Sequence, residues 1–460
     1  MADRTTEVTA QQRQQVMTER HVERILDRVG MNSVFKMLLL SACFGYVFDA
    51  LDNGLLGYAM PLMAADFHIS NVMKGYLLSI GLWGGVLGQF VWGWLAEKKG
   101  RLFAFQGTIL SFAGFTGLTA LAWSPAVVFV TRFITGAGLN GFVPVDTTMV
   151  SEFSPTNQRG RYTGLIAVLW PVGAMLGLGI SLYVLPHIGW RWLFVIGVLP
   201  AVIVWSIRRR VPESPRWLIN QGRVEETVHS LKQLGATEEL LREELAVPDV
   251  TVSTKKEQGT LRDLFSSKRI RGTVLAWFLW FANLYASMSL IVWLPSIFIQ
   301  VYHFSLVRSL SYTLATTTCG LIGRLLGIYL LEKAGRRFSL GYSLFLAGGC
   351  MLAFGYVTDP KLLLVVAMSL YFFNEQAGVC QMAYIPELFP TRMRMKGNAW
   401  CSATARIVAA TSPILVGYLL AANRYHVVSI VFSLTLFLPF LVFMVWGPET
   451  KGRGLEEVTR

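Results

Sequence analysis

Long apolar blocks constrain this chain more than any other feature of its sequence. Each block is close to the ~20 residues that a helix needs to cross the hydrocarbon core of a bilayer. Most blocks lack the alternation of polar and apolar faces that a helix of a soluble protein shows. Only 15% of the 460 residues are charged, whereas a soluble domain has about 25%. The sequence therefore predicts an all-α membrane protein.

Twelve apolar spans can be counted, and a polar stretch separates the sixth from the seventh. They lie near residues 34–62, 74–96, 102–123, 126–150, 161–185, 190–207, 273–300, 309–331, 338–358, 361–384, 397–421 and 427–446. The pattern predicts an N-terminal segment, a six-helix bundle, a central loop with short helices, a second six-helix bundle and a tail, at residues 1–33, 34–207, 208–272, 273–446 and 447–460. Within the loop, residues 224–234 are patterned as an amphipathic helix.

Lysine and arginine gather in alternate loops. The rich loops hold Lys98, Lys99, Arg101, Arg159, Arg161, Lys333, Arg336, Arg337, Arg392, Arg394 and Lys396. Because basic loops of membrane proteins stay in the cytoplasm, we expect this side to be cytoplasmic, together with both termini and the central loop. We expect a multi-pass membrane protein. Orientation also explains the net charge of +13 better than nucleic-acid binding, because no basic stripe with interleaved aromatics is present.

The two halves repeat each other. The pattern E-K-x-G-R starts at Glu97 and again at Glu332, and E-x-x-P-T starts at Glu152 and again at Glu387. For each motif, the second copy starts the same number of residues after the first. We call this number of residues the repeat interval. Two motifs with one interval predict two pseudo-symmetric bundles related by an axis along the membrane normal. Such folds place their substrate between the halves, near the bilayer midplane.

Three segments carry a resemblance to a known family. They read GWLAEKKGR at 93–101, PESPRWL at 212–218 and PETKG at 448–452. With them, nearly the whole chain resembles the major facilitator superfamily, although Glu97 stands where that family usually has aspartate. The resemblance implies twelve helices in two bundles and secondary active transport by alternating access. Together with the short loops, it also implies a place in the inner (plasma) membrane of a cell.

Shorter patterns refine the resemblance. FDALD at 48–52 resembles aromatic acid–proton symporters, and PVD at 144–146 followed by Glu152-Phe153 resembles bacterial niacin transporters and synaptic-vesicle-protein-like carriers. Residues 280–283 lack the paired glutamines of sugar porters. The resemblance thus implies proton-coupled uptake of a small organic anion such as nicotinate or benzoate. Alternatives are an exporter of organic cations or drugs, a sugar or polyol–proton symporter, and a non-transporting receptor.

Charges inside the spans are candidates for proton coupling, because ionisable groups are costly in hydrocarbon. Asp49 and Asp52 are three residues apart and so share a helix face. Arg132 is predicted at a similar depth, and similarity to proton-coupled sugar porters implies an Asp–Arg pair in these helices. We predict that Asp52, with Asp49 beside it, pairs with Arg132 and switches protonation during transport. The alternative is a fixed structural ion pair.

Arg406 is the leading candidate for substrate binding. A guanidinium near the midplane can bond both oxygens of a carboxylate, unless Arg406 pairs with Glu375 instead. Other candidates offer rings for stacking or polar groups for hydrogen bonds: Trp170, Trp280, Tyr285, Tyr371, Trp400, Asn283, Asn374, Glu375 and Gln376. Packing and interface roles are the alternative for the aromatic residues.

Charges on the basic side are candidates for gating. They are Glu97, Arg101, Asp146, Glu152, Arg159, Glu332, Arg336, Glu387 and Arg394. We expect Glu97 to approach a helix start in the other half, Asp146 to act in gating or packing, and bridges from Glu152 and Glu387 to form when the inner side closes and to break when it opens. These charges also fix topology.

Enzymatic chemistry has no support in the sequence. We find no phosphate loop, nucleophile elbow or metal-ligand cluster, and therefore expect no cofactor or metal, with the proton gradient as driving force. The five cysteines form no CxxC pair and suit apolar packing. The expected partners are the organic anion, the proton and the bilayer, with no nucleic acid, and we expect a monomer.

Overall fold

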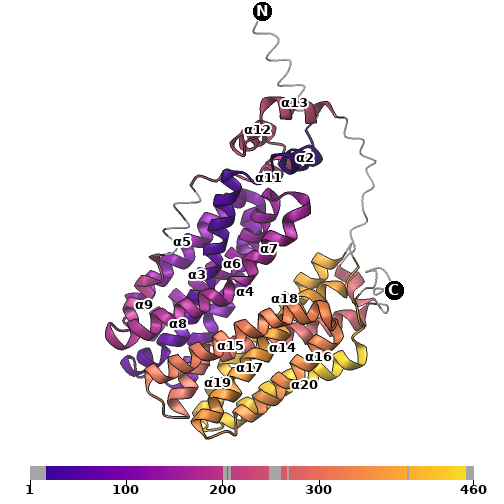
Figure 1. Ribbon diagram of the computed structural model, residues 1–460. Coiled ribbons are helices and arrows are strands. Elements are labelled where there is room, and N and C mark those ends of the chain that lie inside the picture. Colours follow the sequence, from indigo (N-terminus) through magenta and orange to yellow (C-terminus); the bar gives the residue numbers. More distant parts are fainter. Residues whose placement is uncertain are drawn as a thin grey trace, which may run out of the picture.

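The computed structural model describes residues 17–199, 202, 205, 209–247, 261–266, 269–390 and 393–451. All regular elements in these ranges are helices, which confirms the predicted all-α class. Figure 1 shows two elongated bundles side by side, which meet at one end and diverge toward the other. Residues 1–16, part of the sixth span, residues 248–260 and 452–460 lie outside the described residues, so the predictions for them stay untested.

The first bundle is built from the first half of the chain. Its helices are α3 (Ser33–Asp66), α4 (Asn71–Lys99), α5 (Arg101–Ala120), α6 (Pro125–Phe153), α7 (Arg159–Val168), α8 (Trp170–His187) and α9 (Trp190–Ile196), with a short 3-10 turn, η1 (Thr156–Gln158), before α7. The fifth predicted span is divided into α7 and α8. The sixth begins with α9 and then enters residues that are not described.

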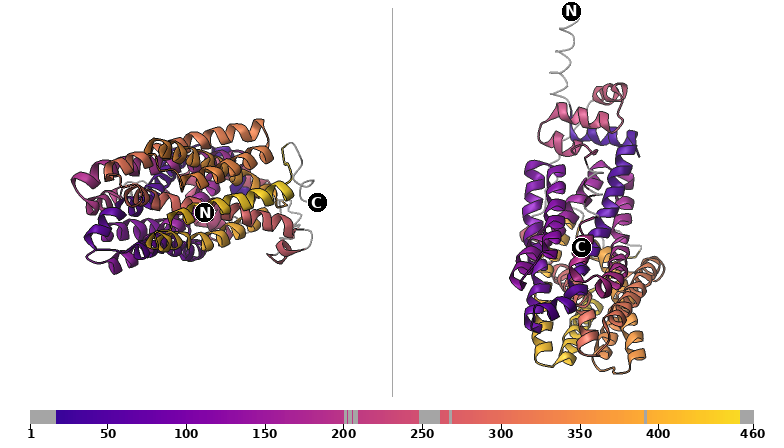
Figure 2. Two further views of the ribbon diagram at one scale, coloured as in Figure 1. Left: turned by 90° about the horizontal axis from the view of Figure 1, so that it is seen from below. Right: turned by 90° about the vertical axis from the view of Figure 1, so that its left-hand side faces the viewer.

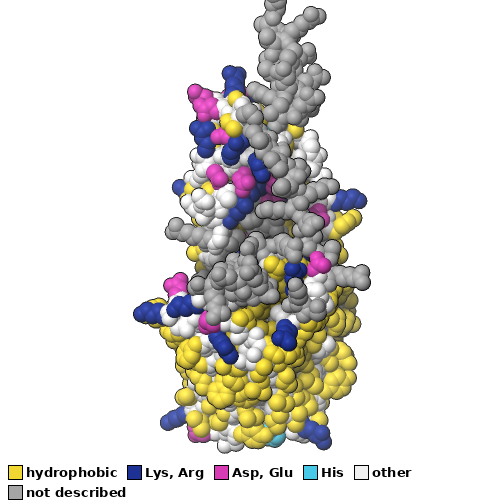
Figure 3. Space-filling view, turned by 90° about the vertical axis from the view of Figure 1, so that its right-hand side faces the viewer, with side chains coloured by type: hydrophobic (Ala, Val, Ile, Leu, Met, Phe, Trp, Pro, Cys, Tyr) yellow, Lys and Arg dark blue, Asp and Glu magenta, His cyan; other side chains and the backbone are white. Residues whose placement is uncertain are grey.

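The second bundle holds α14 (Ile270–Gln300), α15 (Leu306–Lys333), α16 (Arg336–Phe354), α17 (Pro360–Glu387), α18 (Arg394–Ala409), α19 (Ser412–Ala421) and α20 (Tyr425–Trp446), preceded by η2 (Leu261–Phe265). The eleventh predicted span is divided into α18 and α19. In the described part of the chain, eleven helical stretches are long and apolar enough to cross a membrane. Figure 3 shows hydrophobic side chains covering a broad zone of the surface, with charged side chains at its borders.

The sequence repeat is also a structural repeat. Helices α4, α5 and α6 start at residues 71, 101 and 125, and α15, α16 and α17 start at 306, 336 and 360. Each start in the second bundle follows its counterpart by the repeat interval. Gly88 lies against the backbone of Ala137, and Gly323 lies against that of Phe372. Glycines at these positions let the paired helices approach closely.

A glutamate caps the third helix of each bundle. Glu213 accepts hydrogen bonds from the backbone N–H groups of Arg101 and Leu102 (3.0 and 3.1 Å). Glu449 accepts from those of Arg336 and Arg337 (both 3.0 Å). These groups have no partner inside their own helix, and their positive dipole end favours a carboxylate. The glutamates belong to the segments at 212–218 and 448–452, so those motifs act as helix caps.

The glycine of each E-K-x-G-R motif makes room for its cap. Gly100 and Gly335 have φ angles of +109° and +88°, which residues with a Cβ rarely adopt. A Cβ on Gly100 would also meet the carboxylate of Glu213, and one on Gly335 would meet that of Glu449. In each bundle the E-K-x-G-R motif and the glutamate segment, at 212–218 or 448–452, therefore act together as one helix cap.

Four short helices form a layer at one end of the first bundle: α2 (Glu19–Val29), α11 (Pro215–Asn220), α12 (Val224–Gln233) and α13 (Glu238–Ala246). Figure 2 (right) shows this layer above the long helices. Arg28 of α2 bonds Glu243 and Glu244 of α13 (both 3.0 Å). The helix predicted at 224–234 is present as α12.

The two bundles touch at the end away from this layer, which we call the closed end. There the hydroxyls of Tyr76 and Tyr418 are 3.1 Å apart, and the Ser79 hydroxyl donates to the Ala410 carbonyl in the break between α18 and α19. Gly57 lies against the backbone of Val292. The opposite end, where α4 ends with Lys98 and Lys99, is the basic end. The bundles diverge there (Figure 1).

A candidate binding cavity between the two bundles

A cavity of about 1350 Å³, including its open mouth, lies between the bundles. Its wall comes from both halves of the chain: Tyr46, Asp49, Asn53, Leu82, Val86, Gln89, Asn140, Val143, Trp170, Trp280, Asn283, Leu284, Ser287, Met288, Arg324, Glu375, Gly378, Met382, Arg406, Ala409 and Ala410. Six predicted binding or coupling residues are on this wall: Asp49, Trp170, Trp280, Asn283, Glu375 and Arg406.

Arg406 faces an amide of the opposite bundle. Its Nη1 donates to Asn140 Oδ1 at 3.2 Å. Among the described residues no carboxylate lies within ion-pair distance of Arg406, so its pairing with Glu375 is wrong. Asn140 was not among the predicted residues, although other amides inside apolar spans, such as Asn283, were named as candidates.

Glu375 is instead held by Arg324 of α15. Arg324 donates from Nη2 (2.7 Å) and Nε (3.0 Å) to the same oxygen, Oε2. The two side chains are 11% and 16% exposed. Arg324 was not among the predicted residues, although an arginine inside an apolar span is in itself a signal of function.

Asp49 faces the cavity and lies apart from Arg132. Its carboxylate accepts from Trp170 Nε1 at 3.2 Å and from Asn53 Nδ2 at 3.1 Å. Asp49 therefore lies near Asp52 on α3, as predicted, but forms no ion pair with Arg132 among the described residues. Three residues turn a helix by about 300° and advance it by ~4.5 Å, which is enough to direct the two aspartates to different neighbours.

The predicted pair of Asp52 and Arg132 is present. Arg132 Nη2 lies 3.0 Å from Asp52 Oδ2, and the side chains are 5% and 2% exposed. Thr116 donates to the other carboxylate oxygen at 2.7 Å, and the guanidinium lies over the ring of Phe194. Neither residue lines the central cavity, but Arg132 lines an adjoining pocket that shares Asn53, Trp170 and Met288 with it. Its role in coupling stays a prediction.

Five predicted binding residues do not line the cavity. Tyr285 packs edge-on against Phe432 inside the second bundle, and Asn374 donates to the Ser287 hydroxyl at 2.8 Å. Tyr371 lines a small gap between α8 and α15, Gln376 is fully buried, and Trp400 is 38% exposed. Their spans were identified correctly, but the rotation of each helix directs these side chains elsewhere. Direct substrate contact by them is not supported.

Glu152 and Glu387 form bridges to two of the arginines at the basic end. Arg101 pairs with Glu152 at 3.2 Å and Arg336 with Glu387 at 3.3 Å. Each bridge joins the third and fourth helices of one bundle, and both are formed while the basic end is open. The expectation that these bridges break when this end opens is therefore wrong.

The remaining gating candidates are spread over the basic end. Arg159 pairs with Glu23 of α2 at 2.7 Å instead of with Glu152 or Glu387. Glu97 and Glu332 are exposed, and the helix start near Glu97 is capped by Glu213 of the same half. Asp146 is fully buried in α6, and Arg394 is half-buried at the start of α18.

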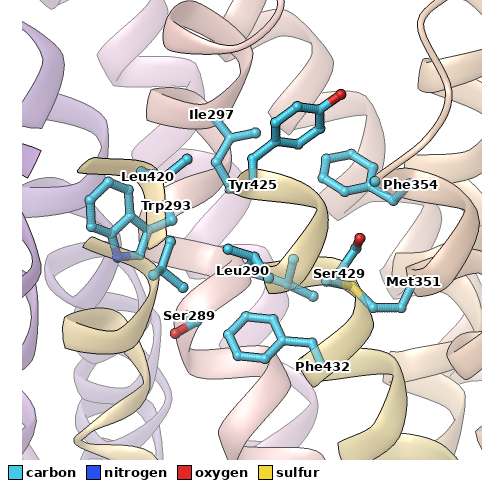
Figure 4. A pocket seen from close by; sticks show the side chains of 13 residues that line it. Ser289, Leu290, Trp293, Ile297, Met351, Phe354, Leu420, Tyr425, Ser429 and Phe432 are labelled. Carbon is cyan, nitrogen blue, oxygen red and sulfur yellow. The ribbon is translucent and has the colours of Figure 1, made fainter. Parts of the chain in front are cut away.

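A second cavity lies inside the second bundle (Figure 4), and its empty volume is about 390 Å³. Its wall is largely apolar, and its two serines, Ser289 and Ser429, donate to Ser412 and to the His426 carbonyl (both 2.7 Å). No charged side chain is among its lining residues. This cavity does not suit an ion, and the central cavity is the candidate site.

The central cavity carries four ionisable charges that balance. Asp49 and Glu375 oppose Arg324 and Arg406, and one pair is already joined. The other arginine, Arg406, contacts only a neutral amide among the hydrogen bonds found in the described residues. Trp170 and Trp280 add aromatic surface, with the Trp280 Nε1 fixed by Asn398 at 3.1 Å. This arrangement suits a carboxylate attached to a flat ring.

Comparison with known proteins agrees with this architecture. Residues 42–381 match the family model of the Major Facilitator Superfamily. The niacin transporter NiaP of Acinetobacter baylyi is 32% identical over 430 residues, covering 92% of this chain and 95% of that protein. The putative niacin/nicotinamide transporter NiaP of Bacillus subtilis is 29% identical, covering 92% and 98%.

A solved structure shows the same fold. The crystal structure of the D-xylose-proton symporter superposes with a TM-score of 0.71 at 19% identity, covering 92% of this chain and all of that one. The fold, the cavity between pseudo-symmetric halves and the family match agree. This chain is a multi-pass membrane transporter that belongs to the major facilitator superfamily.

Proposed function

We propose that this transporter imports a small aromatic or heteroaromatic monocarboxylate, such as nicotinate, together with a proton. The observation that carries the proposal is Arg406, a guanidinium on the cavity wall whose partner is the neutral Asn140. A niacin transporter among its relatives supports the same substrate class. One chain supplies both walls of the cavity, so we propose that a monomer is the transport unit.

Orientation follows from the basic end. Loops rich in lysine and arginine stay in the cytoplasm, so the basic end, with both termini, faces the cytoplasm of a cell whose inner membrane holds the protein. The cavity then opens inward, and the closed end faces outward. Alternating access would separate the bundles at the closed end, where the Tyr76 and Tyr418 hydroxyls meet, and bring them together at the basic end.

Binding would use the groups already on the wall. The carboxylate takes the place of Asn140 Oδ1 on the guanidinium of Arg406, where two parallel hydrogen bonds are available. The ring lies against Trp170 or Trp280, and the amide of Asn283 can serve a ring nitrogen. The indole of Trp170 donates a hydrogen bond to Asp49. Binding of the substrate ring against Trp170 is therefore linked to the protonation state of the Asp49 carboxylate.

Proton coupling follows from charge balance. The empty cavity is neutral when its four ionisable groups are charged, and a bound carboxylate makes it negative. A proton on Asp49 restores neutrality, and among the described residues Asp49 has no ion pair to lose. Asp52 lies about one turn further along α3, where it pairs with Arg132 of α6. We propose that they transmit the change at Asp49 to the contact between α3 and α6.

Uptake of labelled nicotinate and benzoate into proteoliposomes tests the proposal, with an inward proton gradient present or absent. Arg406→Ala should lower the initial rate by about 100-fold or more, since it removes a charged hydrogen-bonding partner. Asp49→Asn should abolish the response to the gradient but keep exchange of labelled for unlabelled substrate. Wild-type uptake that ignores the gradient would refute coupling, and unchanged uptake by Arg406→Ala would refute the site.

Export of an organic cation is the second candidate, because Asp49 on the cavity wall has no ion-pair partner in the described residues. Glu375 is less available, since Arg324 neutralises it. Binding of labelled tetraethylammonium that survives Arg406→Ala but not Asp49→Asn would favour this candidate. The opposite pattern with nicotinate would favour the anion.

A further inference from the structure

The structural repeat places unlike residues at matching positions of the cavity wall. Gln89 of the first bundle matches Arg324 of the second, and Asn140 matches Glu375, each one repeat interval apart. All four residues line the cavity. Gly85 lies against Asn140 just as Gly320 lies against Glu375. The first bundle therefore has two neutral amides where the second bundle has an ion pair.

The ion pair decides how many arginines an incoming anion can reach. Two guanidiniums line the cavity, but Arg324 directs Nε and Nη2 to Glu375. Arg406 meets only an amide oxygen. A second substrate carboxylate near Arg324 would find that guanidinium neutralised and the Glu375 carboxylate beside it. Like charges in such a partly buried site repel more strongly than they would in bulk water.

We propose that Glu375 limits the site to one carboxylate, so that it selects monocarboxylates over dicarboxylates by keeping Arg324 occupied. This inference rests on the proposed function, because it assigns the first carboxylate to Arg406. It makes Arg324 a latent second anion site and Glu375 a specificity-determining residue. Specificity then has two sources: the attractive contacts of the substrate, and the competition of Glu375 with a second substrate carboxylate for the Arg324 guanidinium.

Competition binding on the purified transporter tests the inference. Labelled nicotinate is displaced by unlabelled nicotinate and by pyridine-2,3-, 3,4- and 3,5-dicarboxylate, which vary the second carboxylate on the same ring. The readout is the ratio of dicarboxylate to monocarboxylate affinity within one variant. Glu375→Gln should raise this ratio by about tenfold or more for at least one isomer, as expected for a new charge-assisted pair.

Two further variants separate the mechanism from a mere change of charge or shape. Arg324→Gln combined with Glu375→Gln should lose the gain, because the second guanidinium is gone. Glu239→Gln, the same change at an exposed site on α13, should keep the wild-type ratio. If Glu375→Gln does not yield folded protein, Glu375→Ala replaces it, with the same expected gain.

The outcomes distinguish the two proposals. No gain for any isomer, or an equal gain in the double variant, would overturn the role of Glu375. If nicotinate binding by the wild type were absent or independent of Arg406, the proposed function would fail. The direct binding of labelled dicarboxylate to Glu375→Gln and to the double variant would still decide the role of Arg324.

Discussion

At the basic end the two bundles share their chemistry, whereas at mid-depth they differ. Both have a glutamate cap and an Arg–Glu bridge between their third and fourth helices. At mid-depth the first bundle buries Asp52 with Arg132. The matching positions of the second bundle, one repeat interval later, hold the uncharged Ser287 and Ala367. The second bundle has its own pair, Arg324 with Glu375, on the cavity wall.

This difference separates scaffold from function. The glutamate caps and Arg–Glu bridges, which occur in both halves, hold helices together and would do so for any substrate. The charges that occur in one half only make the two walls of the cavity unlike, which a substrate with distinct ends requires. The largest expected effects therefore come from changing the residues that differ, and smaller effects come from changing the shared caps.

Arg132→Ala should give the largest loss of stability. It leaves the carboxylate of Asp52, which is 2% exposed, without its cation, and breaking a buried pair costs about 3–5 kcal/mol. Thermal unfolding in detergent measures the loss. Arg324→Ala should cost less, because its pair borders the open cavity. Equal losses would show that the two pairs do not differ in burial as described.

Asn140→Glu would give the first bundle the glutamate that the second bundle has at the matching position, Glu375. The new carboxylate lies opposite Arg406, which now bonds the Asn140 amide at 3.2 Å, and should capture it. We expect the affinity for nicotinate to fall by about 100-fold, equivalent to ~2.7 kcal/mol. Gln89→Glu adds the same charge at a neighbouring wall position and should cost less. If both variants lost the same affinity, net charge and not capture would be the cause.

Gly335→Ala and Gly100→Ala test the shared cap. A Cβ at either glycine requires an unfavourable positive φ and meets the cap carboxylate, so we expect a loss of about 1–3 kcal/mol at each. Similar values would support a single device in both bundles. Gly349 of α16 has open space around it, and Gly349→Ala should be neutral or stabilising in the same unfolding assay.

The two cap glutamates should respond differently to pH. Burial raises the pKa of Glu213 above its ordinary value of 4.5 despite its backbone donors. Burial also acts on Glu449, but its four backbone N–H donors hold that pKa below 4.5. A lowered pKa contributes stability that is present above 4.5 and is lost as pH falls through the folded value, whereas a raised pKa disfavours the ionised form at neutral pH.

Glu449→Gln should therefore destabilise more than Glu213→Gln at pH 7, by a few tenths of a kcal/mol up to ~1 kcal/mol. Between pH 7 and pH 5 the deficit of Glu449→Gln should stay constant. The wild type should gain stability relative to Glu213→Gln as pH falls through the raised pKa of Glu213. Unfolding temperatures of the three proteins at both pH values measure this, and parallel curves would contradict the assigned pKa directions.

The sequence by itself determined the spans, the repeat, the basic side and the family. These depend on apolar length, on one repeat interval shared by two motifs and on local patterns, all of which are properties of the linear chain. It also paired Asp52 with Arg132, since both are charges at a similar depth and the similarity to proton-coupled sugar porters implies such a pair in these helices. Arg406 was assigned to the cavity for a similar reason.

Only the tertiary structure decided which partner each of the other charges has. Asp49 binds Trp170 and Asn53, Glu375 binds Arg324, and Arg406 crosses the cavity to Asn140. Depth along a helix can be counted from the sequence, but the direction of a side chain depends on how each helix is rotated about its axis. That rotation is set by close contacts such as Gly85 against Asn140 and Gly320 against Glu375, which exist only once the helices have packed.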